Sequence, residues 1–200
     1  MSGLSRLALD ALQGDAVAVA RNLLGARLVR VIGEERRSGR IVETEAYRPG
    51  DPASHAFRGE TSRNRSMFGR PGLAYVYFTY GSCHCVNVVC EPEGVGAAVL
   101  IRALAPEEGA AGMARARGRE SDLASGPGRL CQALEIDRRL DGVDLLASDV
   151  LYLAAGDPVR DSQVASTPRI GISRARDLPW RFAVAGDPHL SRRARSHATA

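Results

Sequence analysis

The stretch LAYVYFTYGSCHCVNVVC, residues 73–90, contains two strong strand candidates. It holds two runs rich in β-branched and aromatic residues, LAYVYFTY and HCVNVVC, on either side of Gly81 and Ser82. Runs of this kind around a short glycine-containing turn predict two strands of an antiparallel hairpin. The run AAVLIRAL, residues 97–104, has a similar composition and predicts a further strand.

The remaining chain predicts a mixture of helices and strands. Residues 15–24 predict a helix capped by Asp15 and stopped by Gly25. RLVRVI and RIVETEAY predict a hairpin with EERRSG as its turn, and residues 48–70 predict a long polar loop. Further helices are expected in GAAGMARARGRESDLASG and RLCQALEI, and short strands in DVLYLAA, PRIGIS and WRFAVAG.

The order of these elements predicts an α+β fold around a largely antiparallel sheet, because strands follow one another as hairpins and do not alternate regularly with helices. No internal repeat or linker divides the chain. A single domain spanning residues 1–200 is therefore expected, with residues 1–14 and 191–200 frayed.

The charges and the apolar runs limit the chemistry and the location. All 27 basic side chains are arginine, and they exceed the 23 acids to give a formal charge of +4. Without lysine, a covalent imine could use only the N-terminal amine. No apolar run approaches the length that spans a bilayer, and the N-terminus lacks a signal-peptide pattern, so a cytoplasmic protein with no membrane association is expected.

The four cysteines are Cys83, Cys85, Cys90 and Cys131. Three of them fall in the cluster CHCVNVVC, which suggests a metal site. Zinc sites usually close with a second pair of ligands, and the sequence offers none at the right spacing. Buried free thiols in a reducing compartment are the favoured interpretation. A thiol or metal protein built on Cys83, His84 and Cys85 is the weaker alternative.

Polar residues interrupt three strands that should belong to the core. Glu43 and Glu45 lie two residues apart in VETEAY, so they share one strand face, and like charges in that arrangement usually mark a solvated edge. Asn87 lies among valines, and Arg102 follows VLI. Taken singly, each fits a strand end or a sheet edge. Together they suggest a buried polar site, because buried charges need partners. A glutamate in contact with Arg102 and a water molecule would supply a general base.

Aromatic residues lie near a loop rich in arginine. Tyr47 follows the glutamates, and Tyr75, Tyr77 and Tyr80 mark the hairpin. The segment RGETSRNRSMFGR, which contains Arg63, Asn64 and Arg65, lies just before that hairpin. Aromatic rings can stack on a nucleic-acid base, and neighbouring arginines can bind the phosphate backbone. The pattern suits an RNA-binding module without catalysis equally well. No Walker loop, GxGxxG, HExxH or GxSxG motif supports a nucleotide-cofactor enzyme, a metalloprotease or a serine hydrolase.

A family resemblance is carried by several blocks in a fixed order, over about residues 17 to 187. These blocks are RNLLGARLVR, GRIVETEAY, the spaced His55, RNRSMFGRPGLAYVYFTYG, CVNVV, VLIRALAPEEG and GPGRLCQALEID. Together they resemble the 3-methyladenine (alkyladenine) DNA glycosylases of the MPG type. The resemblance implies a compact domain with a curved antiparallel sheet surrounded by helices. It also implies a monomeric, monofunctional enzyme without metal or cofactor, which flips a damaged purine out of double-stranded DNA and hydrolyses its N-glycosidic bond.

The resemblance also implies roles for individual residues. Glu45 matches the general base, while Arg102 and the backbone carbonyl of Ile170 match the groups that hold its water. The flipped base would lie between Tyr47, His55 and Tyr77, with polar contacts from the backbone at Ala53 and His55. Asn87 would crowd the exocyclic amine of guanine, and Tyr80 would fill the gap left in the duplex. Phosphate contacts are expected from Arg63, Asn64 and Arg65.

The chain departs from vertebrate members after the expected wedge. Ser82, Cys83 and His84 replace bulkier groups there, so the wedge is expected to be thinner. The preferred lesion, a role for Glu43 and any DNA contact by the C-terminal tail are left open. A non-catalytic nucleic-acid-binding module remains the main alternative, and it predicts salt-sensitive binding with no release of base.

Overall fold

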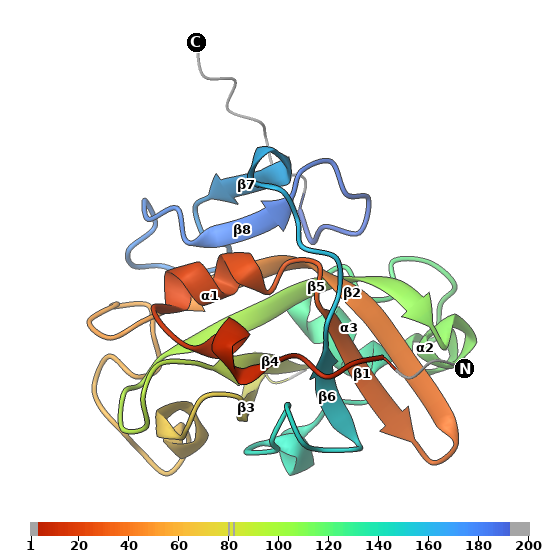
Figure 1. The fold of residues 1–200 in the computed structure, drawn as a ribbon, viewed down its shortest axis with the longest axis horizontal. Coiled ribbons are helices and arrows are strands. Elements are labelled where there is room, and N and C mark those ends of the chain that lie inside the picture. Colours follow the sequence, from red (N-terminus) through yellow and green to blue (C-terminus); the bar gives the residue numbers. More distant parts are fainter. Residues whose placement is uncertain (1–3, 80, 82, 193–200) are drawn as a thin grey trace.

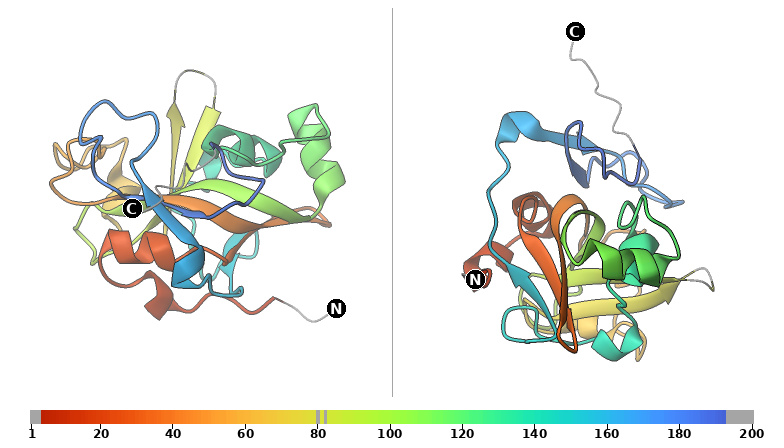
Figure 2. Two further views of the ribbon diagram at one scale, coloured as in Figure 1. Left: turned by 90° about the horizontal axis from the view of Figure 1, so that it is seen from above. Right: turned by 90° about the vertical axis from the view of Figure 1, so that its right-hand side faces the viewer.

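The structure is a computed structural model that describes residues 4–79, 81 and 83–192. Its centre is one curved antiparallel sheet (Figure 1). The main path runs in the order β3 (Ala74–Thr79), β4 (Cys83–Val89), β5 (Ala98–Glu108), β2 (Glu35–Tyr47), β1 (Arg27–Ile32) and β6 (Leu151–Ala154). Off this path, β7 (Val164–Thr167) pairs with β8 (Arg181–Val184), which also pairs with β2. The β3/β4 hairpin projects from the body of the molecule (Figure 2).

Short helices cover parts of this sheet. The α-helices are α1 (Ala16–Asn22), α2 (Ala110–Arg117) and α3 (Pro127–Ala133). The short 3₁₀ helices are η1 (Leu9–Leu12), η2 (Arg65–Phe68), η3 (Arg138–Leu140) and η4 (Asp161–Gln163). α1 packs against β2 and β5, and α3 packs against β4 and β5. No helix in the described part of the chain is long and apolar enough to cross a membrane.

The position of β5 within the sheet explains why the run AAVLIRAL is almost entirely apolar. Residues 98–105 of β5 are all buried, because apolar clusters pack on both faces of the strand. Val99, Ile101 and Leu104 belong to the main core, while Ala103 and Ala105 pack in a second cluster. Arg102 is the charged residue within this buried run. The α+β class and the antiparallel sheet are therefore confirmed, and a charged group lies at the centre of the molecule.

Several predicted boundaries are wrong. Only Glu34 of the segment EERRSG lies in the turn, because the chain reverses at Gly33, with φ of 59°, and Glu34, and β2 begins at Glu35. PRIGIS forms no strand, and β7 ends directly before it. The loop over residues 48–70 contains η2, whose Met67 is buried although the loop was expected to be polar throughout.

Both chain ends are better packed than expected. Leu12 is fully buried in η1, and the amide of Leu7 donates to the carbonyl of Leu153 at 3.1 Å. The described residues before position 15 thus contact the body of the protein, and their fraying stays a prediction. At the other end, Ser191 contacts Glu43 through its backbone and its side chain. Residues 1–3 and 193–200 lie outside the described part, so the expected fraying is not assessed there.

Asp15 caps α1 as the sequence predicts. Its Oδ1 accepts from the amide of Val17 at 2.8 Å, and its Oδ2 pairs with Nη1 of Arg48 at 3.0 Å. We expect Asp15→Ala to lower the free energy of unfolding by about 1 kcal/mol, as loss of an N-cap usually does. Asp15→Asn should retain most of this stability, because asparagine also caps helices. Urea unfolding measures both, and an equal loss in the two variants would assign the effect to the ion pair with Arg48.

Candidate active site

Two buried glutamates on β2 form the centre of the site. Glu43 and Glu45 are both fully inaccessible to solvent, so their interpretation as a solvated strand edge is wrong. The register between β2 and β5 shifts on both sides of Glu43, which marks an irregularity in the ladder at this point. Buried carboxylates require charged or hydrogen-bonding partners, and each of the two has its own set.

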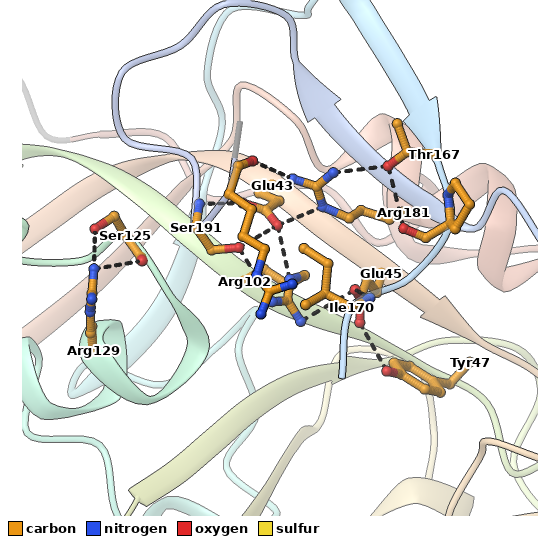
Figure 3. A network of polar contacts seen from close by, with 12 residues as sticks. Glu43, Glu45, Tyr47, Arg102, Ser125, Arg129, Thr167, Ile170, Arg181 and Ser191 are labelled. Atoms are coloured by element: carbon orange, nitrogen blue, oxygen red, sulfur yellow. Dashed lines mark hydrogen bonds and ion pairs between the residues drawn. The ribbon is translucent and has the colours of Figure 1, made fainter. Parts of the chain in front are cut away.

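Glu45 is held by three groups from three parts of the chain (Figure 3). Its Oε1 accepts from the backbone amide of Ile170 at 2.7 Å and lies 3.2 Å from Nη1 of Arg102. Its Oε2 accepts from the hydroxyl of Tyr47 at 2.9 Å. Burial and the Glu45 carboxylate raise the pKa of Tyr47, so this phenol keeps its proton and remains a donor.

Arg102 links the two glutamates. Its Nε donates to Oε1 of Glu43 at 2.9 Å, while Nη1 faces Glu45. Burial alone would lower the pKa of Arg102, but the carboxylates of Glu45 and Glu43 raise it above its usual range. Arg102 is thus a permanent positive charge between two carboxylates.

A cavity of about 430 Å³ lies next to this cluster. That volume falls in the usual range for small-molecule pockets, about 300–1,000 Å³. The cavity brings together seven of the residues that the sequence singles out: Tyr47, Ala53, His55, Tyr77, Asn87, Arg102 and Ile170. Glu45 does not line it. This carboxylate lies behind its three partners, all of which do.

One wall of the cavity is aromatic. The rings of His55 and Tyr77 meet edge to face, with centroids 4.5 Å apart. Nδ1 of His55 also lies 2.8 Å from the hydroxyl of Tyr75, a residue given no specific role from the sequence. Burial raises the pKa of Tyr75 to about 12, so its hydroxyl remains protonated and fixes the imidazole.

Burial, assisted by the charge of Arg63, lowers the pKa of His55 below its ordinary value of 6.5. We therefore expect the ring to be neutral at pH 7 and to titrate below pH 6.5 in an NMR experiment, with His55→Gln used for assignment. Because the unfolded chain binds this proton at higher pH than the folded chain, stability due to His55 is lost as the pH falls below the unfolded value. A titration midpoint of His55 at or above pH 6.5 would contradict a lowered pKa for this imidazole.

The backbone groups expected to touch a ligand have partners within the loop. The amide of Ala53 donates to Oδ1 of Asp51 at 3.0 Å, and the carbonyl of His55 accepts from Nδ2 of Asn64 at 2.9 Å. Asn87 is also held, because its Nδ2 donates to the carbonyl of Tyr75 at 2.9 Å. The loop is thus organised by its own hydrogen bonds before any ligand arrives.

The expected phosphate contacts divide into two kinds. Arg63 and Arg65 are exposed, and the Arg65 side chain is 79% accessible and pairs with Glu60 at 3.3 Å. Asn64 is only 3% accessible, and its amide bonds to Thr61, Gly59 and His55. The Asn64 side chain thus holds the loop from inside, and its contact with phosphate stays a prediction. Tyr80, the expected wedge, lies outside the described residues.

Sequence reasoning missed a buried ion pair between the residues that precede Pro52 and Ile170 in the cavity lining. Arg169 and Asp51 are both fully buried, and Nη2 of Arg169 lies 2.9 Å from Oδ1 of Asp51. Nη1 of Arg169 donates to the same carboxylate and to the carbonyl of Ala46, and the guanidinium lies 4.7 Å from the ring centre of Tyr47. The two partners are 118 positions apart, and no local pattern connects them.

The cysteines are free thiols. Cys85, Cys90 and Cys131 are buried as expected, whereas Cys83 is only partly buried. Cys85 lines the cavity, and burial raises its pKa to about 11, which keeps it a thiol at neutral pH. Within the described residues, no three His, Cys, Asp or Glu side chains are grouped as a metal site would require.

Comparison with known proteins places this chain in a family. The family model for methylpurine-DNA glycosylase (MPG) matches residues 10–188. A protein of Rubrobacter xylanophilus, provisionally named 3-methyladenine DNA glycosylase, is 56% identical over 83% of this chain and 87% of its own length. Proteins with the same provisional name in Carboxydothermus hydrogenoformans and Streptomyces avermitilis are 47% and 49% identical, over 90% and 86% of this chain and 95% and 84% of their own lengths. The chain belongs to the methylpurine-DNA glycosylase family.

Proposed function

We propose that this protein hydrolyses the N-glycosidic bond of alkylated or deaminated purines in duplex DNA, as the first step of base excision repair. The observation that carries the proposal is the carboxylate of Glu45, held by Ile170, Tyr47 and Arg102 directly behind an aromatic cavity. The family membership and the provisional names of the relatives support the same activity.

The cavity suits a base that has left the duplex. Enzymes that act on a base must take it out of the stack, at a cost of a few kcal/mol that is smallest for a damaged base. Tyr47, His55 and Tyr77 supply stacking faces and edges for a purine. Because the Ala53 amide and the His55 carbonyl already have partners, we assign contacts with the base edge to the Ala53 carbonyl and the His55 amide.

The chemistry follows from the position of Glu45. Loss of the purine develops positive charge on the sugar, and a nearby carboxylate stabilises that charge. The same carboxylate accepts a proton from the attacking water, with Arg102 and the Ile170 carbonyl as the further groups that hold this water. Strand cleavage by a glycosylase would require an amine that forms an imine with the sugar, and the chain contains no lysine. We therefore propose that the enzyme hydrolyses the glycosidic bond and does not cleave the strand.

Binding to DNA is assigned to the surface around the cavity. Arg63 and Arg65 are exposed beside the loop that lines it, and they would neutralise phosphates. Asn87 would restrict the exocyclic group of the base, and Tyr80 would replace the flipped nucleotide in the duplex. We propose that one copy of the chain suffices, since every group named here comes from a single copy.

A panel of duplexes tests this function, each with one hypoxanthine, 1,N6-ethenoadenine or 3-methyladenine. We expect free base, detected by mass spectrometry, and a strand that breaks only after alkali. An undamaged duplex of the same sequence is the control. Salt-sensitive binding with no release from any lesion would instead support the non-catalytic binding module.

A further inference from the structure

Glu43 is the most heavily bonded side chain of the site, and the roles assigned so far do not use it. Its Oε1 accepts from Nε of Arg102 at 2.9 Å, from Nε of Arg181 at 2.7 Å and from Oγ of Ser191 at 2.7 Å. Its Oε2 accepts from the backbone amide of Ser191 at 2.7 Å (Figure 3). Strands β5 and β8 and the C-terminal segment thus converge on one carboxylate.

The charges of this cluster balance. The carboxylates of Glu43 and Glu45 face the guanidinium groups of Arg102 and Arg181, and all four residues are buried. Burial alone would raise the pKa of Glu43, but Arg102 and Arg181 hold it below its usual range. Glu43 is therefore a fixed negative charge, and its loss would leave two buried arginines with one carboxylate.

The contact with Arg102 has a directional consequence. A guanidinium offers five N–H donors in a rigid plane, so fixing Nε also fixes the direction of the remaining donors. With Nε on Glu43, Nη1 points to Glu45, and Nη2 lies 3.3 Å from Oγ of Ser191. Ser191 therefore contacts both Glu43 and the arginine.

We propose that Glu43 is a positioning residue of the hydrolytic step, which together with Ser191 orients Arg102 toward Glu45. This inference rests on the proposed function, because it assigns Glu43 a part in the same reaction. The C-terminal segment also takes part, because Ser191, 148 positions from Glu43, donates two of the hydrogen bonds that hold the Glu43 carboxylate. Arg181 extends this connection, donating to Oγ1 of Thr167 and to the carbonyl of Arg192.

The test compares Glu43→Gln and Ser191→Ala with Ser125→Ala as a matched control. Ser125 is buried where Ser191 is partly buried, and it is hydrogen-bonded to Asp122 and Arg129 but contacts neither glutamate. We expect the single-turnover rate of base release to fall about 10- to 100-fold in Glu43→Gln and about 3- to 10-fold in Ser191→Ala. The control should keep the wild-type rate, and all three variants should bind the lesion duplex as the wild type does.

Comparing rate, binding and stability separates positioning from a purely structural part. Glu43 is faced by Arg102 from β5, by Arg181 from β8 and by Ser191. Glu43→Asp keeps a negative charge between the two arginines, so we expect it to recover part of the single-turnover rate lost in Glu43→Gln, with the affinity for the lesion duplex unchanged. A structural part would lower the melting temperature and leave the single-turnover rate of the folded protein in place.

The outcomes are distinct. A folded Glu43→Gln protein with the wild-type single-turnover rate would overturn the positioning role. If Glu43→Gln fails to fold, Ser191→Ala decides, and a wild-type rate in that variant would overturn the proposal. Wild-type protein that releases no base from any lesion would overturn the proposed function as well, which distinguishes the two failures.

Discussion

Replacing Glu45 with glutamine is expected to lower the single-turnover rate of base release at least about 100-fold, the lower range for loss of a general base. Glutamine keeps the size of the side chain and an oxygen that can accept from the Ile170 amide. Its amide nitrogen can donate to the Tyr47 hydroxyl, which then accepts where it now donates. The lower rate therefore reflects the hydrolytic step alone, and binding to a lesion duplex should be retained.

Rapid quench of a hypoxanthine duplex measures the rate, and fluorescence anisotropy measures the binding. Glu108→Gln is the matched control, because Glu108 lies on the neighbouring strand β5 and pairs with Arg36 away from the cavity. It should leave both quantities unchanged. A Glu45→Gln protein that releases base at the wild-type rate would show that another group activates the water.

Replacing Arg169 with methionine is expected to lower the free energy of unfolding by about 3–5 kcal/mol, as when one partner of a buried ion pair is removed. The carboxylate of Asp51 would remain buried without its cation. The change would also remove the donor to the Ala46 carbonyl and the cation beside the Tyr47 ring. Urea unfolding followed by circular dichroism measures the loss.

Two further variants give this prediction its reference points. Arg65→Met removes an exposed arginine that pairs with Glu60, and it should cost less than about 1 kcal/mol. Combining Arg169→Met with Asp51→Asn removes both buried charges, so it should be more stable than Arg169→Met alone. A loss for Arg169→Met no larger than that for Arg65→Met would show that the buried pair contributes little.

The sequence predicts the fold well where local patterns decide the structure. The strands around Gly81 and the helix after Asp15 are confirmed, because β-branched runs, a turn and an N-cap act over a few residues. The turn placed at EERRSG is wrong, because pairing with β1 and β5 extends β2 through residues of low strand propensity. PRIGIS forms no strand, and its Arg169 instead pairs with Asp51, 118 positions away.

The candidate site divides in the same way. The family resemblance groups Glu45 with Tyr47, His55 and Arg102. In the structure the latter three line one cavity, and Glu45 lies behind it, bonded to Tyr47 and Arg102. Period-two alternation suggested a solvated acidic edge, because it carries no information about which charges arrive from distant segments. The contacts of Glu43 with Arg181 and Ser191 come from such segments, 138 and 148 positions away.

A crystal structure of Glu45→Gln bound to a duplex with a single hypoxanthine tests most directly whether Glu45 is the general base. We expect the purine outside the helix, in the cavity between Tyr47 and His55, with its sugar carbon facing residue 45. A purine that remains stacked in the duplex, or one that enters the cavity with its sugar directed away from residue 45, would contradict that role.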